Sequence, residues 1–240
     1  MKVFSFCLYG PYNPKYYVGM IENIHLIHKH FPGWYIYIYL GADVDTTTVN
    51  VLSSAPRVIL RWTGKVGADN MINRFFAIDE PGVELMMVRD ADSRIHWRDR
   101  WAIRQFENAP YFIAHAIRDN KKHSTTMMGG LWGIRKSANL HIETDYEGYK
   151  KNPIEIGFAH DQDFLSVCIY PSVVKKLLVH VGNGAPTAPI ETCVEFPFPV
   201  QDSFYCGRVE PPGFVDAQGP SQSERILHAN FPLLSKLSRK

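Results

Sequence analysis

The sequence has no long hydrophobic run. No stretch of its 240 residues approaches the ~18 consecutive apolar residues of a transmembrane helix. The first apolar run, Val3–Leu8, meets Gly10 and Pro11 too soon to form the apolar region of a signal peptide. We therefore expect neither a membrane span nor a secretion signal.

Closely spaced cysteines are also missing. The four cysteines, Cys7, Cys168, Cys193 and Cys206, form no C-x-x-C pair and no zinc-ligand spacing. Dispersed thiols of this kind are typical of reduced proteins in the cytosol. The sequence therefore predicts a cytoplasmic protein.

Neither sign of charge is in excess. The 26 Lys and Arg residues against 24 Asp and Glu leave a formal net charge of +2, so we expect no nucleic-acid partner. The 45% hydrophobic and 21% charged content is typical of a globular protein. No internal repeat and no low-complexity linker divides the chain. We expect a single domain over residues 1–240.

Short apolar segments alternate with helix-like segments through the first half of the chain. The patterns predict strands at residues 3–8, 34–40, 58–60 and 84–88, and helices at residues 17–31, 46–55 and 68–78. This alternation indicates an α/β fold with a mainly parallel central sheet flanked by helices. In such sheets ligands bind beyond the carboxyl ends of the strands.

Two carboxylates, Asp90 and Asp92, directly follow the last of these strands. At a strand end they would project to the same side, with roughly 6–7 Å between their α-carbons. Such a pair can share Mn²⁺ or Mg²⁺, which also bridges a substrate diphosphate. Alternatively, the carboxylates cap a helix and pair with Arg89, Arg94 or Arg98. ATP and dinucleotide sites lose their main support because neither G-x-x-x-x-G-K-[ST] nor a strand-linked G-x-G-x-x-G is present.

Two later clusters carry further candidate groups. Asp161 and Gln162 begin a helix-like segment, where Asp161 could instead be only a helix cap. His180 ends a short apolar strand and enters a Gly-rich loop, so it is either a structural histidine or a metal ligand beside backbone N–H groups that face phosphate.

Taken together and in this order, the motifs resemble the nucleotide-sugar-dependent glycosyltransferases of the Rossmann-like GT-A fold. Three segments carry the resemblance: VRDADSRIHWRDRWAI, HAIRDNKKH and MMGGLWGIRK. They are similar to a group that includes bacterial enzymes and glycosyltransferases of large chlorella-type algal viruses. The resemblance covers roughly residues 70–180. It implies a nucleotide-binding half in residues 1–100 and an acceptor-side half in residues 101–240.

The order of the D-x-D motif, the DQDFL motif and a late histidine also looks like retaining galactosyltransferases and glycogenin. In those enzymes the late motif reads H-x-x-G-x-x-K-P-W. The corresponding HVGNGAPTAP has another glycine spacing and no lysine. The resemblance implies that Asp90 and Asp92 hold Mn²⁺, or Mg²⁺, with His180 as the third ligand and His228 as the alternative.

The resemblance also implies the residues around the substrates. Asp161 and Gln162 would lie near the anomeric carbon. Independently of the resemblance, Tyr12, Tyr16 and Tyr17 lie in the first loop, where one of their rings could stack on a base. The donor would be bordered by Cys7, Leu8, Tyr9, Gly10, Arg61, Arg74, Asp90, Ala91, Asp92, Gly129 and Gly130. The acceptor side would include Arg118, Asp119, His123 and Trp132, although Arg118 and Asp119 could equally form an internal ion pair.

The implied activity is metal-dependent transfer of a hexose or deoxyhexose from a UDP-sugar to a glycan or glycoprotein glycan. The cation would stabilise the leaving diphosphate. Configuration is kept if Asp161 and Gln162 only stabilise an oxocarbenium-like sugar, and inverted if Asp161 removes the acceptor proton. We expect retention, and for a viral enzyme the host cytoplasm. The alternatives are a metal-dependent nucleotide-sugar hydrolase or phosphoesterase, and a non-catalytic nucleotide- or glycan-binding module.

Overall fold

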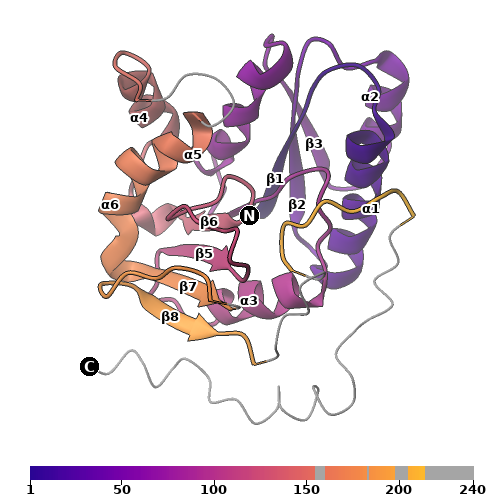
Figure 1. Cartoon of the computed structure of the whole chain (residues 1–240). Coiled ribbons are helices and arrows are strands. Elements are labelled where there is room, and N and C mark those ends of the chain that lie inside the picture. Colours follow the sequence, from indigo (N-terminus) through magenta and orange to yellow (C-terminus); the bar gives the residue numbers. More distant parts are fainter. Residues whose placement is uncertain (155–159, 183, 198–204, 214–240) are drawn as a thin grey trace.

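A single sheet runs through the part of the chain that this computed structural model describes, residues 1–154, 160–182, 184–197 and 205–213. Its strand order is β3-β2-β1-β4-β6-β5-β7-β8 (Figure 1). The strands are β1 Lys2–Leu8, β2 Tyr35–Leu40, β3 Val58–Trp62, β4 Leu85–Val88, β5 Ala114–Arg118, β6 Trp132–Arg135, β7 Leu177–Val181 and β8 Thr192–Glu195. All neighbours are parallel except β6, which runs antiparallel to both β4 and β5.

Helical segments cover both faces of this sheet (Figure 1). They are α1 Pro14–His30, α2 Thr46–Ser53, η1 Gly67–Ile78, α3 Trp97–Glu107, η2 Lys136–Ala138, α4 Ile142–Tyr149, α5 His160–Phe164, η3 Leu165–Ile169, α6 Tyr170–Val173 and η4 Val174–Lys176. Helix α1 begins where the Asn13 side chain accepts a hydrogen bond from the amide of Lys15, with Pro14 in its first turn. It ends at His30, and its C-cap residue Phe31 stands directly before a proline.

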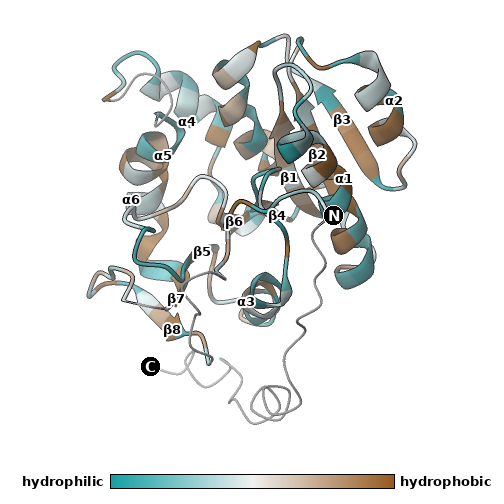
Figure 2. Cartoon of the chain, turned by 45° about the vertical axis from the view of Figure 1, so that its right-hand side comes forward, coloured by the Kyte–Doolittle hydropathy of each residue, from teal (hydrophilic) through white to brown (hydrophobic). Residues whose placement is uncertain are grey.

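The alternation of side chains along the strands builds two apolar layers. Phe4, Phe6, Ile36 and Ile38 face helix α1, whereas Val3, Cys7, Tyr37 and Tyr39 face η1 and the helices that follow β6. Figure 2 shows hydrophobic and hydrophilic residues interspersed along the helices that flank the sheet. Because both faces are covered, the central strands are buried along nearly their whole length.

The predicted α/β class with a mainly parallel sheet is confirmed. The segment 68–78, predicted as a helix, forms the 3₁₀ segment η1, which starts one residue earlier. Strands β5, β6 and β8 were not predicted, and β6 inserts between β4 and β5. No helix among the described residues is long and apolar enough to cross a membrane.

Candidate functional site

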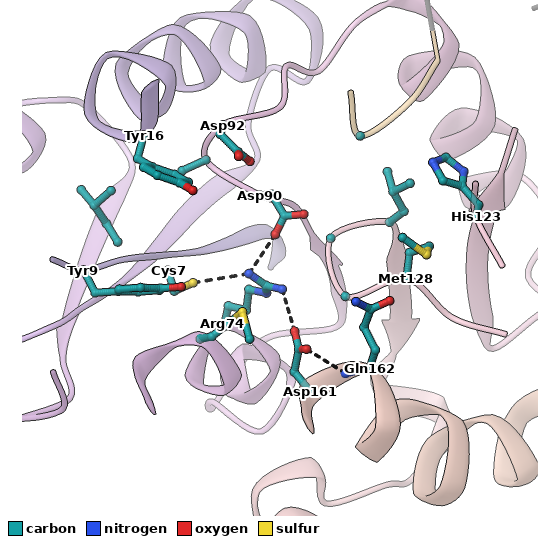
Figure 3. Close-up of a pocket in the computed structure, with 17 residues that line it drawn as sticks. Cys7, Tyr9, Tyr16, Arg74, Asp90, Asp92, His123, Met128, Asp161 and Gln162 are labelled. Carbon is teal, nitrogen blue, oxygen red and sulfur yellow. Dashed lines mark hydrogen bonds and ion pairs between the residues drawn. The ribbon is translucent and has the colours of Figure 1, made fainter. Parts of the chain in front are cut away.

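A cavity of about 290 Å³ opens at the carboxyl ends of β1 and β4 (Figure 3). The strand ends, η1, the loop before β6 and the first turn of α5 all contribute side chains to it. Its lining consists of Cys7, Leu8, Tyr9, Tyr16, Met71, Arg74, Asp90, Ala91, Asp92, His123, Met128, Gly129, Gly130, Leu131, Asp161, Gln162 and Gly207. The predicted donor residues therefore meet largely as expected from the position of ligands in parallel sheets.

Arg74 of η1 links the two sides of the cavity. Its guanidinium lies 2.8 Å from Asp90 Oδ1 and 2.9 Å from Asp161 Oδ2, and its Nη1 donates to Cys7 Sγ at 3.5 Å (Figure 3). The Arg74 and Asp161 side chains are only 6% and 2% exposed, whereas that of Asp90 is 37% exposed. The buried guanidinium thus holds together two carboxylates that are far apart in the sequence.

The surroundings of Arg74, Asp90 and Asp161 shift the pKa values of two acidic groups, Asp90 and Cys7. Burial raises the pKa of Asp90, while the adjacent charge of Arg74 lowers it and the carboxylates of Asp92 and Asp161 raise it further. Burial also raises the pKa of the Cys7 thiol to about 11, so Cys7 stays protonated near neutral pH. Cys7 therefore packs against Arg74 and does not act as a thiolate nucleophile.

Asp92, the second carboxylate of the D-x-D motif, has its own cation. Lys15 Nζ lies 2.8 Å from Asp92 Oδ2 and 3.2 Å from the hydroxyl of Tyr16. The two carboxylates do not extend a strand, because the Asp90 carbonyl accepts hydrogen bonds from both the amide and the hydroxyl of Ser93. A turn after β4 therefore directs Asp90 and Asp92 into the same cavity.

A segment more than a hundred residues away, residues 205–213, holds this turn in place. Val209 forms an antiparallel bridge with Ser93, and the amide of Glu210 donates to the carbonyl of Asp92 at 2.9 Å. Arg94 Nη2 donates to the carbonyl of Glu210 at 3.4 Å. No sequence signal pointed to this contact.

Asp161 and Gln162 enter the cavity from the start of α5. Asp161 Oδ1 accepts a hydrogen bond from the amide of Gln162 at 2.8 Å, while Oδ2 faces Arg74. The Gln162 side chain accepts from the hydroxyl of Thr125 at 3.2 Å. Asp161 therefore bonds a free amide of the first helical turn and also belongs to the charged cluster, so the two alternatives from the sequence are not exclusive.

The backbone of Gly129 and Gly130 passes directly beside these charges. A Cβ at Gly130 would lie 2.0 Å from Asp90 Oδ2, and one at Gly129 would lie 2.7 Å from Asp161 Oδ2 and 2.8 Å from Arg74 Nη2. Only glycine allows the backbone to pass so close to the trio.

We therefore expect Gly130→Ala to displace the Asp90 carboxylate and to weaken any ligand that Asp90 holds by at least about tenfold, the equivalent of about 1.4 kcal/mol. Gly148→Ala is the matched control, because nothing lies within 4 Å of the added Cβ on helix α4. It should raise stability by up to about 1 kcal/mol through helix propensity. Titration calorimetry and thermal unfolding of both variants measure these effects. Unchanged ligand affinity in Gly130→Ala would contradict the role given to this glycine.

The structure does not bring His180 together with Asp90 and Asp92. Its ring is fully buried on β7, and its Nδ1 lies 2.8 Å from Nε2 of His115. The order β4-β6-β5-β7 puts three inter-strand steps, roughly 14 Å, between the two carboxylates' strand and His180. His228, the alternative ligand, lies outside the described residues.

Three other residues predicted near the substrates, Arg61, Gly10 and Trp132, do not line the cavity. Arg61 donates two hydrogen bonds to Glu80, and Gly10 does not line the cavity but accepts from the hydroxyl of Tyr17. Trp132 packs edge-on against Phe75 in the core.

Most of the predicted acceptor residues also lie outside the cavity. Arg118 pairs with Glu191, and Asp119 pairs with Arg98 and accepts from the amide of Cys206. Of the four, His123 alone lines the cavity. The internal Arg118–Asp119 ion pair that the sequence left open is not formed among the described residues, because each of the two side chains pairs with another partner.

Three apolar side chains of the lining, Met71, Met128 and Leu131, were not anticipated. Met71 lies one 3₁₀ turn before Arg74, so the position of Arg74 could have indicated it. Met128 and Leu131 flank the glycine pair, and no pattern distinguished them from core residues.

Comparisons with known proteins rest on structure, since no protein-family model and no curated protein matches the sequence. A glycosyltransferase involved in the glycosylation of the major capsid of PBCV-1 matches with a TM-score of 0.52 and 14% identity, over 75% of this chain and 82% of that one. TarS of S. aureus matches at 0.47 and 12%, over 74% and 57%. A 4-diphosphocytidyl-2C-methyl-D-erythritol synthase from Anaerococcus prevotii matches at 0.49 and 9%, over 76% and 88%. The first similarity establishes a shared fold.

Proposed function

We propose that the chain is a glycosyltransferase that moves a hexose or deoxyhexose from a UDP-sugar to a glycan, with a divalent cation and with retention of configuration. The meeting of Asp90, Arg74 and Asp161 in one cavity beside Gly129 and Gly130 carries the proposal. The fold shared with the PBCV-1 capsid glycosyltransferase supports it. The uridine base and the class of sugar rest on the resemblance of the sequence motifs.

The two ends of the cavity suit the two substrates. Tyr9 and Tyr16 lie at one end beside Asp92, whereas His123, Met128 and Gln162 lie at the other (Figure 3). Aromatic rings next to a carboxylate that would hold a diphosphate-bound cation suit a nucleoside, because a base can stack on them. The donor therefore belongs at the end formed by residues 1–100, and the acceptor at the end formed by the later part of the chain.

Asp90 and Asp92 suit Mn²⁺ or Mg²⁺ as two hard oxygen ligands. Asp90, whose side chain is 37% exposed, lines the cavity together with Asp92. The Lys15 side chain that pairs with Asp92 is itself 38% exposed, so a cation can displace it. No described histidine accompanies the pair, so bound phosphates or water would complete the shell. When bound, the cation stabilises the charge of the leaving diphosphate.

Arg74 and Asp161 would act around the reacting sugar. Arg74 places a fixed positive charge beside Asp90, where phosphate charge grows as the sugar departs. Both oxygens of Asp161 already accept hydrogen bonds, one from Gln162 and one from Arg74. An oriented carboxylate of this kind stabilises positive charge on the sugar but is poorly placed to take the acceptor proton, which favours retention.

Nucleotide binding provides the first test. We expect UDP to raise the thermal stability only when Mn²⁺ is present, since a ligand at a hundredfold excess over its Kd adds about 2.7 kcal/mol. GDP, CDP, ADP and dTDP serve as comparison ligands, and Asp92→Asn should abolish the Mn²⁺-dependent shift. Absence of any shift with all five nucleotides would contradict the proposal.

Transfer itself provides the second test. Asp90→Asn and Asp161→Asn should each lower the transfer rate by at least about a hundredfold, because each removes a charge at the reacting centre. Asp163→Asn is the matched control, since Asp163 lies two residues along α5 and binds the hydroxyl of Tyr149. It should retain near-normal activity. Equal turnover of the UDP-sugar with and without acceptor would instead indicate a hydrolase.

A further inference from the structure

A second cavity, of about 410 Å³, lies at β3, the edge strand of the sheet. Its lining consists of Tyr39, Arg61, Trp62, Thr63, Asn73, Phe76, Asp79, Glu80, Pro81 and Glu143. It shares no residue with the first cavity, because Met71 and Arg74 of η1 face that one while Asn73 and Phe76 face this one. The two cavities are therefore separate binding places on either side of η1.

A buried hydroxyl at this cavity lacks a partner. Tyr39 is 6% exposed, and its hydroxyl makes no hydrogen bond within the described residues. Burial raises the pKa of Tyr39 and the charge of Glu80 raises it further, so the hydroxyl keeps its proton and can donate. Oδ1 of Asp79 is likewise buried without a partner among these residues. A buried polar group without a partner is costly, so a donor and an acceptor here indicate a polar ligand.

The charges of the lining restrict the class of ligand. Asp79, Glu80 and Glu143 are acidic, and the guanidinium of Arg61 is already bound by both carboxylate oxygens of Glu80, at 2.8 and 3.0 Å. In the described part of the chain neither Asp79 nor Glu143 pairs with a cation, and the Asp79 carboxylate accepts a hydrogen bond only from the amide of Glu143, at 2.8 Å. This excess of negative charge disfavours phosphates, nucleotides and acidic sugars.

A single metal ion does not fit the same groups. Among the described residues, His96, Asp99 and Cys206 are the one group of three ligand side chains close enough to share an ion, and they lie elsewhere. Asp79, Glu80 and Glu143 are thus too widely spaced for one cation. The lining instead offers separate hydrogen-bonding groups: carboxylates, the hydroxyl of Tyr39 and the side-chain amide of Asn73. Groups of these kinds can bind the hydroxyls of a neutral polyol.

We propose that this cavity is a second carbohydrate site, which takes a neutral hexose or deoxyhexose residue. Sugar hydroxyls would accept from Tyr39 and donate to Asp79 and Glu143, while Phe76 and the exposed edge residue Trp62 provide apolar surface for the C–H face of the ring. The site would hold a sugar without nucleotide, cation or transfer. It therefore stands independently of the proposed activity.

The test is saturation-transfer NMR with the methyl glycosides of glucose, galactose, mannose, rhamnose and fucose, without nucleotide or metal. At least one should bind wild-type protein, and Tyr39→Phe should weaken it by about tenfold while leaving the free protein at least as heat-stable. Tyr37→Phe is the control, because it removes the same hydroxyl from the neighbouring ring, which lies outside the cavity. Glu143→Gln, at an exposed position, should also weaken binding.

Two comparisons decide the location. Binding that persists in Asp161→Asn and in the presence of UDP with Mn²⁺, but falls in Tyr39→Phe, supports the second cavity. Binding that is lost in Asp161→Asn and kept in Tyr39→Phe belongs to the first cavity and overturns the proposal. No binding of any of the five glycosides, or a melting temperature lowered by Tyr39→Phe, also overturns it.

Discussion

Arg74→Met is expected to destabilise the protein by about 3–5 kcal/mol and to abolish the proposed sugar transfer. The change leaves the buried Asp161 carboxylate beside Asp90 without the cation that now lies 2.8 and 2.9 Å from them. Two carboxylates that had shared one guanidinium would then repel each other, and the burial of Asp161 adds to the cost. Urea unfolding at pH 7 measures the loss, and a radiolabelled-sugar assay measures transfer.

The pH dependence of the same variant identifies the cause. Burial already raises the pKa of Asp90 and the Arg74 charge opposes that rise, so without Arg74 the pKa of Asp90 should rise further and folding would take up a proton. The deficit in unfolding free energy should therefore shrink as the pH falls from 7 towards 4. A deficit that is the same at both pH values would indicate lost packing instead.

Arg61→Met is the matched control for stability. Its guanidinium is also bound by a carboxylate through two hydrogen bonds, but its side chain is 40% exposed. We expect a loss of no more than about 1 kcal/mol, because solvent screens exposed ion pairs. Similar losses in both arginine variants would contradict the special position of Arg74.

The second large effect concerns acid. His115 and His180 form a fully buried pair between Phe106 and Trp101, with Nε2 and Nδ1 2.8 Å apart. Burial lowers the pKa of His180 from 6.5 to about 3, and burial together with the neighbouring His180 lowers that of His115 well below 6.5. Arg89 and Arg135 add to the shift of His115. Both rings are therefore neutral in the folded protein.

The sign of the pH effect follows from these lowered pKa values. Above pH 6.5 the two rings are neutral in both the folded and the unfolded state, so they do not lower the stability. Below pH 6.5 the rings bind protons in the unfolded chain but not in the folded protein, which favours unfolding. Stability should fall by about 1.4 kcal/mol per pH unit for each ring, beginning at pH 6.5. The range from pH 6.5 to 5 is the informative one, because carboxylates titrate mainly below it.

Urea unfolding between pH 7 and 5 measures this slope. The double variant His115→Leu with His180→Leu should flatten it, although the lowered pKa values of His28 and His123 leave a remainder. His25→Gln, at an exposed position, is the control and should keep the wild-type slope. If the double variant keeps that slope too, the buried pair is not its origin.

Much of the first half of the fold could be predicted because its patterns are local. Isoleucines and tyrosines alternate along β2, and Asp90 and Asp92 directly follow an apolar strand. The rule that ligands bind at the carboxyl ends of parallel strands then places these carboxylates near Cys7. Asp161 was predicted to lie near Asp90 and Asp92 only because the order of the motifs resembles that of known glycosyltransferases.

The position of His180 could not be predicted, because strand order is a property of the whole sheet. Strand β6 enters antiparallel between β4 and β5, and that insertion moves β7 away from Asp90. The role of residues 205–213 was also hidden. A single bridge between Ser93 and Val209 has no periodicity that a sequence could reveal.

That bridge also determines when the site is completed during synthesis. Arg94 and its partner Glu210 are 116 residues apart, which at about 5–20 residues per second corresponds to roughly 6–23 s of translation. Throughout that interval β1–β4 can pair while the turn carrying Asp92 still lacks its backbone partner. A ribosome-bound chain stalled before Val209 should therefore capture nucleotide poorly, even though its sheet has begun to form.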